Sequence, residues 1–264
     1  MKILRIIYKT ICTFTIIMSF FIVSAIIQIA LPFSKFKKRK VITKVSAFHS
    51  KAMLKVLGFH LTLKGSLPKD GVMIIGNHMS YLDILIYLSF FEALFVTSVD
   101  MRERLFLGQV TQMGGCIFVE RRNPRGLPKE MRSIKEFFNK GFSVCIFPEG
   151  TSSDGATVLP FKNSMFQIPL ETGCPVQPIV LKYSKINNQP FGPNNCDYVC
   201  WYGDLGFFPH LMGLFTLKRI EASLTVLPPI DSNDFDNRKA LSTHAHRVLK
   251  ENYHNDQDIS LVHS

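Results

Sequence analysis

Apolar runs and amphipathic segments alternate along residues 72–264, and this alternation predicts helices packed on a sheet. Short apolar runs, typical of buried strands, lie at 72–76, 94–99, 116–119, 142–147, 176–182 and 220–227. Segments with helical spacing lie at 81–91, 105–113, 128–139, 163–171 and 236–253. Pro169 lies inside the fourth helix and should shorten or kink it. The order of the elements predicts an α/β fold with a mixed sheet flanked by helices.

The N-terminal quarter of the chain has a different pattern. No charged residue falls between Thr10 and Ser34, and residues 11–31 are mostly apolar. At a rise of about 1.5 Å per residue, this segment forms about 30 Å of helix, the thickness of a bilayer core. A second, amphipathic helix is expected over 41–59, with lysines on one face. Its apolar stripe is formed by Val45, Phe48, Ala52, Val56 and Phe59.

Three arrangements of this helical pair are compatible with the pattern. The first helix spans the membrane, or both helices form a hairpin sunk into one leaflet, or the second helix packs on the domain. We therefore predict membrane-anchoring helices in residues 1–60 (hydrophobic 10–34, amphipathic 41–59) and an α/β domain in residues 61–264. The fold class is thus α/β, preceded by an N-terminal membrane-associated helical pair.

The formal net charge of +11 belongs to the N-terminal region. Thirteen of the 31 basic residues precede Asp70, which is the first acidic residue, so the remaining 18 face 20 acids and the body is nearly neutral. A nucleic-acid partner is not expected, because such proteins spread their cations over a domain face. The five basic residues within 35–40 outnumber those before the apolar stretch. This bias predicts that the α/β domain lies on the cytoplasmic side of a membrane, the inner or plasma membrane if the source is bacterial.

The six cysteines do not form a metal-binding pattern. Cys196 and Cys200 are close in sequence, but no second pair or histidine pair follows at zinc-site spacing. No metal site is expected, and reduced thiols are typical of a cytosolic domain.

A histidine and an aspartate lie five residues apart where the strand at 72–76 ends. Asp83 can hold the His78 ring in one tautomer, leave its second nitrogen free to accept a proton, and stabilise the imidazolium. The structural alternative is a helix cap, with Ser80 before the helix and Asp83 in its first turn. Residues five apart do not share a helix face, so the pair requires His78 to lie on the preceding loop.

Two other predicted strands also end in polar residues. Residues 118–122 end in Glu120, Arg121 and Arg122, and guanidinium groups bind phosphate through paired hydrogen bonds. Residues 147–153 supply a glycine, hydroxyls and turn amides that can surround an anion. Because active groups on α/β folds collect at the carboxyl ends of strands, these three loops form the candidate site.

In these blocks the chain resembles the lysophospholipid acyltransferase superfamily, and within it the 1-acylglycerol-3-phosphate acyltransferases. Four blocks occur in order over residues 77–181. His78 and Asp83 correspond to the catalytic block. The resemblance implies that Arg121 contacts the phosphate of the acceptor and that Glu149, Gly150 and Thr151 help form the acceptor site. It also implies supporting roles for Asn77, Phe147, Pro148 and Pro178.

Two departures concern the acceptor site. Ser152 and Ser153 stand where the family often has arginine, and residues 97–99 are Thr-Ser-Val where many members have lysine. The missing charge could come from Arg102, Arg104, Arg122 or Lys162.

The resemblance implies acyl transfer from an acyl thioester, acyl-CoA or acyl-carrier protein, to the free hydroxyl of a lysophospholipid. The expected acceptor is 1-acyl-glycerol-3-phosphate, giving phosphatidate, with His78 as general base. The thioester is a co-substrate and no other cofactor is expected, while the partners are membrane lipids. Alternatives are another lysolipid acceptor, a transacylase or lipid hydrolase, and a non-catalytic lipid-binding protein.

Overall fold

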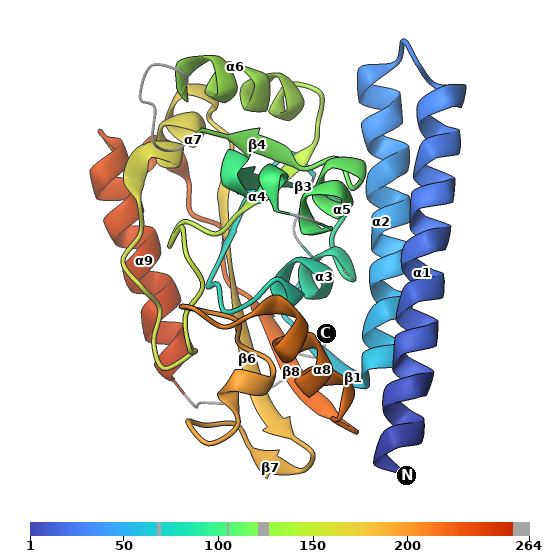
Figure 1. The fold of residues 1–264 in the computed structure, drawn as a ribbon. Coiled ribbons are helices and arrows are strands. Elements are labelled where there is room, and N and C mark those ends of the chain that lie inside the picture. Colours follow the sequence, from blue (N-terminus) through green and yellow to red (C-terminus); the bar gives the residue numbers. More distant parts are fainter. Residues whose placement is uncertain (68–69, 105, 121–126, 256–264) are drawn as a thin grey trace.

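The computed structural model describes residues 1–67, 70–104, 106–120 and 127–255. A mixed sheet forms its centre, in the order β1-β8-β6-β2-β5-β3-β4, with β7 paired to β6 (Figure 1). The pairs β6–β8 and β6–β7 are antiparallel, whereas the other neighbours are parallel. The strands are β1 Phe59–Lys64, β2 Met73–Gly76, β3 Ala93–Ser98, β4 Ile117–Val119, β5 Ser143–Ile146, β6 Val176–Ile186, β7 Gln189–Pro190 and β8 Ile220–Val226. The predicted mixed α/β sheet is confirmed.

Helices cover both faces of the sheet. They are α1 Lys2–Ala30, α2 Lys35–Leu57, α3 Leu82–Leu88, α4 Val99–Glu103, α5 Leu107–Met113, α6 Leu127–Phe138, α7 Gln167–Thr172, α8 Phe207–Phe215 and α9 Arg238–His254, with 3₁₀ turns η1 Asn163–Phe166, η2 Cys196–Tyr198 and η3 Ser232–Asp234. One core joins the sheet to α2, α3 and α8, and the other joins it to α6, α7 and α9. Ile74 of β2 faces the first core while Met73 and Ile75 face the second, because successive strand residues point to opposite faces.

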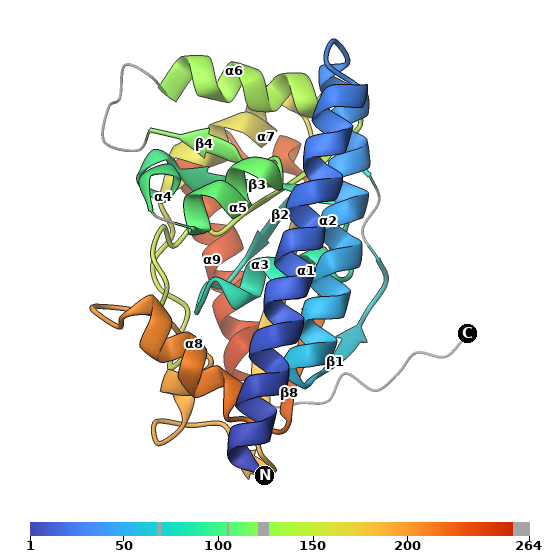
Figure 2. The same cartoon turned by 45° about the vertical axis from the view of Figure 1, so that its right-hand side comes forward.

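The N-terminal helices form a hairpin that lies along the domain (Figure 2). α2 packs on α3 and β1, and α1 packs on α2, α5 and α8. The Lys9 ammonium donates to the carbonyls of Leu57 (2.5 Å) and Leu217 (2.9 Å), and Arg5 donates to that of Thr216. These bonds satisfy carbonyls at the ends of α2 and α8. They attach the first turns of α1 to the domain.

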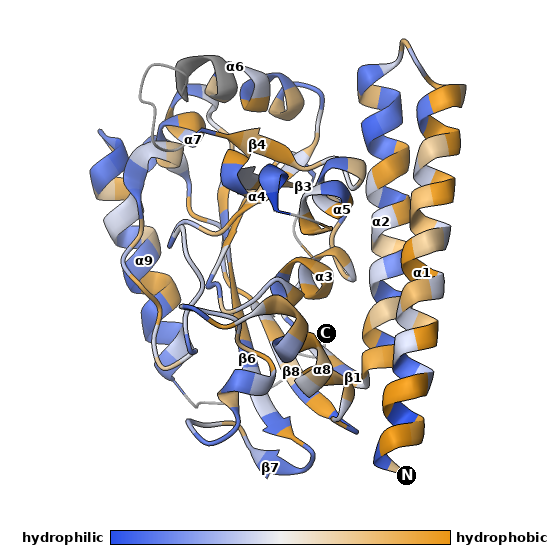
Figure 3. Cartoon of the chain, in the orientation of Figure 1, coloured by the Kyte–Doolittle hydropathy of each residue, from blue (hydrophilic) through white to orange (hydrophobic). Residues whose placement is uncertain are grey.

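The outer face of α1 is apolar and exposed (Figure 3). Exposed residues along it include Ile3, Ile7, Ile11, Phe14, Met18, Ile22, Ile26 and Ile29. Within the described residues, α1 is the single helix long and apolar enough to cross a membrane. A patch of this kind marks an interaction surface.

The buried face of α2 differs from the predicted stripe. Phe48 is 69% exposed, and Phe59 begins β1 instead of ending the helix. The buried face carries Ile42, Ser46, Ser50, Met53 and Leu57, and α2 begins at Lys35. Within the predicted stripe, Phe48 is exposed because the helix turns small serines, which score as polar, toward its neighbours. Small side chains let the backbones of packed helices approach closely. The predicted bounds 41–59 also differ from those of α2, which ends at Leu57.

Several elements were not expected from the pattern. β1, α4 and α8 had no predicted counterpart, and β6 extends to Ile186. α4 has only five residues, which is too short for a helical period to show in the sequence. The effect of Pro169 was predicted: the expected helix is divided into a 3₁₀ turn and α7, with Pro169 in the first turn of α7, where its missing N–H is tolerated.

Candidate active site

His78 lies on the turn between β2 and α3, and Asp83 lies in the first turn of α3. The ring atom Nδ1 of His78 is 2.8 Å from Oδ2 of Asp83. The same carboxylate oxygen accepts the backbone N–H groups of Met79 (2.6 Å) and Ser80 (2.8 Å). Asp83 therefore caps the turn and orients the histidine at once, so the two interpretations of the sequence describe one arrangement. A histidine bonded through Nδ1–H presents Nε2 as its proton acceptor.

The His78 ring is also held by stacking. It lies parallel to the ring of Phe147, with 4.4 Å between centroids and 1° between planes. Tyr87 packs edge-on against the ring of Phe147, with 5.4 Å between centroids. The His78 carbonyl accepts the N–H of Ser153 at 3.0 Å. With its ring and backbone both fixed, the histidine loses little further freedom when a substrate binds.

A close approach of two elements lies directly beneath this turn. A Cβ atom at Gly76 would lie 2.0 Å from the Tyr87 hydroxyl, which donates to the Ile179 carbonyl at 2.8 Å. Only glycine fits between β2 and this tyrosine. Sequence reasoning missed both residues, although a glycine directly before the histidine turn was the available signal.

Glu149 is buried, with 3% of its surface exposed. Its Oε1 accepts the N–H of His78 at 2.8 Å, and its Oε2 accepts the N–H of Leu159 at 2.9 Å. Burial raises the pKa of Glu149 to about 8, although both backbone bonds favour the ionised form. The structure therefore joins Glu149 to the backbone of the histidine turn, and the role in the acceptor site that the resemblance implies stays a prediction.

The neighbouring residues Phe147, Gly150, Thr151 and Ser152 line a pocket of about 260 Å³ that also contains His78. Gly150 has φ of 74°, a conformation that glycine adopts without strain, and Thr151 follows it on the pocket wall. Ser152 donates its hydroxyl proton to the Trp201 carbonyl. Lys162 lies beside Gly150, where a Cβ atom would be 2.9 Å from the ammonium nitrogen. Gly150, Thr151 and His78 thus share one pocket.

Asn77, Pro148 and Pro178, for which supporting roles were predicted, lie near the histidine turn, in β6 or just after β2 and β5. The Asn77 side chain donates to the Leu181 carbonyl (2.9 Å) and accepts the Leu181 N–H (2.8 Å). Its amide continues the β2–β6 ladder past the end of β2. Pro178 lies in β6 opposite Ile75, and the Pro148 carbonyl accepts the Lys162 N–H.

The predicted phosphate contact, Arg121, and its neighbour Arg122 lie outside the described residues. Arg104 lines the pocket, with its guanidinium carbon 5.5 Å from the Trp201 ring centre. Asp100, Thr97 and Ser98 line the same wall. Arg102 instead lies over the ring of Phe118, at 4.5 Å. Of the described cations considered from the sequence, which are Arg102, Arg104 and Lys162, Arg104 is the one that lines this pocket.

Across the described ranges, no group of three or more histidine, cysteine or acidic side chains could hold a metal ion. The arrangement of His78 and Asp83 can perform acid–base chemistry with its own groups.

A family model described as Acyltransferase matches residues 58–182. The chain is 30% identical over 195 residues to the lyso-ornithine lipid O-acyltransferase of Rhizobium meliloti, covering 71% of this chain and 67% of that protein. It is 25% identical over 193 residues to the 1-acyl-sn-glycerol-3-phosphate acyltransferase of Neisseria gonorrhoeae, covering 73% of each. The crystal structure of PlsC, the 1-acyl-sn-glycerophosphate acyltransferase from Thermotoga maritima, shares the fold with a TM-score of 0.68 at 22% identity, covering 96% of each chain.

Proposed function

We propose a specific reaction for this chain, which belongs to the acyltransferase family: transfer of an acyl group from an acyl thioester to the free hydroxyl of a lysolipid. The observation that supports it most directly is the 2.8 Å contact between His78 Nδ1 and Asp83 Oδ2 on the wall of a pocket. The donor is acyl-CoA or acyl-carrier protein, which acts as a co-substrate.

In the proposed mechanism, Nε2 of His78 removes the proton of the lysolipid hydroxyl. The hydroxyl oxygen attacks the thioester carbonyl carbon, the carbon–sulfur bond breaks, and the imidazolium returns the proton to the departing thiolate. Asp83 stabilises the imidazolium between these steps. General-base assistance of this kind contributes a factor of about 10²–10⁴ to the rate. Glu149 acts as a positioning residue, because its side-chain oxygen Oε1 accepts the His78 N–H.

The first candidate acceptor is 1-acyl-glycerol-3-phosphate, which the Neisseria relative uses by its name. In this case Arg104, and Arg121 as the resemblance implies, bind the phosphate. The second candidate is a lyso-ornithine lipid, as the name of the Rhizobium relative states. Asp100 on the pocket wall favours it, because a carboxylate repels a phosphate dianion and attracts the ammonium group of ornithine.

For membrane attachment, we propose the hairpin arrangement in one leaflet, with the domain on the cytoplasmic side. Spanning the bilayer would require α1 to leave the domain and break the bonds of Lys9 and Arg5. The apolar outer face of α1 then contacts acyl chains. Phe208 and Met212 on α8 are also exposed, and α8 packs on α1, so both helices border the same lipid surface.

An acceptor panel tests this function. Purified protein in detergent is given radiolabelled acyl-CoA with 1-acyl-glycerol-3-phosphate, a lyso-ornithine lipid or lysophosphatidylcholine, and lipid products are separated. The proposal expects labelled product with one of the first two acceptors and its loss in His78→Ala. Asp100→Asn should raise transfer to the phosphate acceptor relative to the ornithine acceptor. Labelled product that His78→Ala forms at the wild-type rate contradicts the mechanism.

A further inference from the structure

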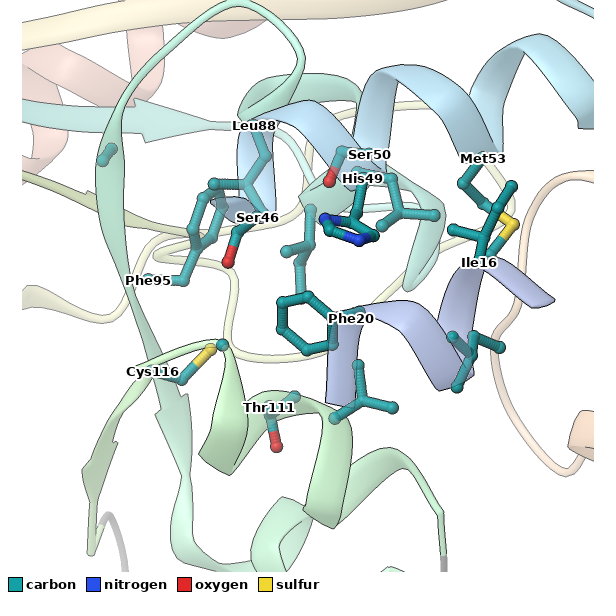
Figure 4. A pocket seen from close by; sticks show the side chains of 16 residues that line it. Ile16, Phe20, Ser46, His49, Ser50, Met53, Leu88, Phe95, Thr111 and Cys116 are labelled. Atoms are coloured by element: carbon teal, nitrogen blue, oxygen red, sulfur yellow. The ribbon is translucent and has the colours of Figure 1, made fainter. Parts of the chain in front are cut away.

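A mostly apolar cavity of about 110 Å³ lies between the N-terminal hairpin and the domain (Figure 4). Its walls come from α1, α2, α3, β3 and α5. Ile84, Phe95 and Thr111 line both this cavity and the pocket that holds His78, so the two spaces adjoin. Ile84 and Thr111 also line a third, almost wholly apolar cavity of about 150 Å³ that reaches α8.

One polar group in the wall of the first cavity has no partner. Ser46 is 5% exposed, and its hydroxyl has no hydrogen-bond partner among the described residues. The hydroxyl points into the space between Phe20, Phe95 and Cys116 (Figure 4). A helical serine ordinarily bonds back to a carbonyl of the preceding turn. Ser46 instead directs an unpaired donor and acceptor into an apolar space, where leaving them unpaired is unfavourable.

The neighbouring polar side chains differ from Ser46 in this respect. His49 bonds through Nδ1 to the Val45 carbonyl (2.8 Å) and through Nε2 to the Ser19 hydroxyl (3.1 Å). Thr111 donates to the Leu107 carbonyl at 2.9 Å. Among the described residues, the Ser46 hydroxyl is the one side-chain polar atom of this wall that is fully buried and has no hydrogen-bond partner.

We propose that this cavity binds an acyl chain that carries a hydroxyl group, and that Ser46 recognises this oxygen. The inference rests on the proposed function, since both the donor and the lysolipid acceptor carry an acyl chain into the adjoining pocket. An unsubstituted chain segment in the cavity would leave the Ser46 hydroxyl unpaired, whereas a segment that carries a hydroxyl group pairs with it. A site that hydrogen-bonds a substrate hydroxyl discriminates strongly against the analogue without it.

A binding measurement that does not depend on catalysis tests the proposal. The full chain in detergent is loaded with a fluorescent fatty acid, which is displaced by hexadecanoic acid or by a panel of hexadecanoic acids that each carry one hydroxyl at a different carbon. We expect at least one hydroxylated isomer to bind about ten-fold more tightly than the unsubstituted acid. In Ser46→Ala this preference should disappear.

Ser24→Ala is the matched control. Ser24 is also buried with an unpartnered hydroxyl, but it lies on α1 and does not line this cavity. The control should keep the preference for the hydroxylated isomer. Equal binding of all acids by the wild type overturns the proposal, and this is the result expected if a bound water pairs with the Ser46 hydroxyl. A preference for a hydroxylated acid that survives Ser46→Ala overturns it as well.

Transfer assays then identify which substrate supplies the chain. One arm places the hydroxyl on the acyl group of the thioester, and the other places it on the chain already present in the lysolipid. The arm whose kcat/KM falls in Ser46→Ala identifies the source. Selective binding without any acyl transfer contradicts the proposed function alone, whereas transfer without selectivity for hydroxylated chains contradicts this inference alone.

Discussion

Oδ2 of Asp83 lies 2.8 Å from Nδ1 of His78, and the same oxygen accepts the backbone N–H groups that cap the turn before α3. Asp83→Asn keeps the size of this side chain but removes the charge that stabilises the imidazolium. We expect kcat to fall by about 10²–10⁴-fold. Initial rates of acyl transfer measure this, with unchanged binding to lipid vesicles as the control. A fall of less than three-fold would show that the carboxylate has only a capping role.

Glu149 should make the stability of the protein depend on pH. Because burial raises its pKa from 4.5 to about 8, the folded state retains a proton that the unfolded chain releases between these values. Its contribution to the free energy of unfolding is therefore full below about pH 4.5 and is lost as pH rises through about 8. Urea unfolding at several pH values measures the slope.

Glu149→Gln removes this titration, so the difference between wild type and variant isolates it from other groups. His210, whose pKa burial lowers to about 4, contributes a slope of the opposite sign in both proteins. The variant should show a less negative slope between pH 5 and 8. It should also transfer acyl groups more slowly, because an amide nitrogen cannot accept a backbone N–H. Parallel profiles for the two proteins would contradict the assignment.

Asn77 should matter for stability. Asn77→Ala leaves the N–H and the carbonyl of Leu181 without partners inside the sheet. Each unpaired buried polar group costs about 1–3 kcal/mol, so the two groups together should lower the free energy of unfolding by about 2–6 kcal/mol. Asn252→Ala, which removes one bond within α9, should cost less than about 1 kcal/mol. Similar losses in the two variants would mean that the amide does not extend the ladder.

The exposed face of α8 should contribute to membrane binding. Phe208 and Met212 are 65% and 42% exposed, and their joint replacement by serine removes apolar surface that we place in the lipid. Vesicle flotation should show binding weakened by about ten-fold. Leu67→Ser removes a 60% exposed apolar side chain outside α1 and α8, and it should leave vesicle binding unchanged. Equal effects of the two changes would exclude a specific role for α8.

The sequence predicted the sheet and the position of the histidine turn because both depend on local patterns. Strands buried on both faces appear as continuous apolar runs, and a polar turn that follows such a run marks the end of a strand. His78 and Glu149 were expected in one site because both follow the carboxyl end of a predicted strand, and the structure shows these strands, β2 and β5, as parallel neighbours. The hydrogen bond from the His78 backbone N–H to the Glu149 side chain was not predictable, since the direction of a side chain depends on tertiary packing.

The buried face of α2 was missed for a related reason. Hydropathy assigns Phe48 to the interior and Ser46 to the surface, yet the structure exposes the first and buries the second. The unpartnered serine hydroxyl that results has no sequence signal. Tyr87 was predicted only as part of a helix, because its contact with Gly76 joins residues from two different elements.

The most direct test of the account follows thiol release from acyl-CoA by the purified full chain, with and without the preferred lysolipid acceptor. If His78 activates a lipid hydroxyl, thiol release requires the acceptor and falls by at least about 10²-fold in His78→Ala. Release of thiol into solution at the same rate without acceptor would identify a hydrolase. An undiminished rate in His78→Ala would contradict the role of the His78–Asp83 pair.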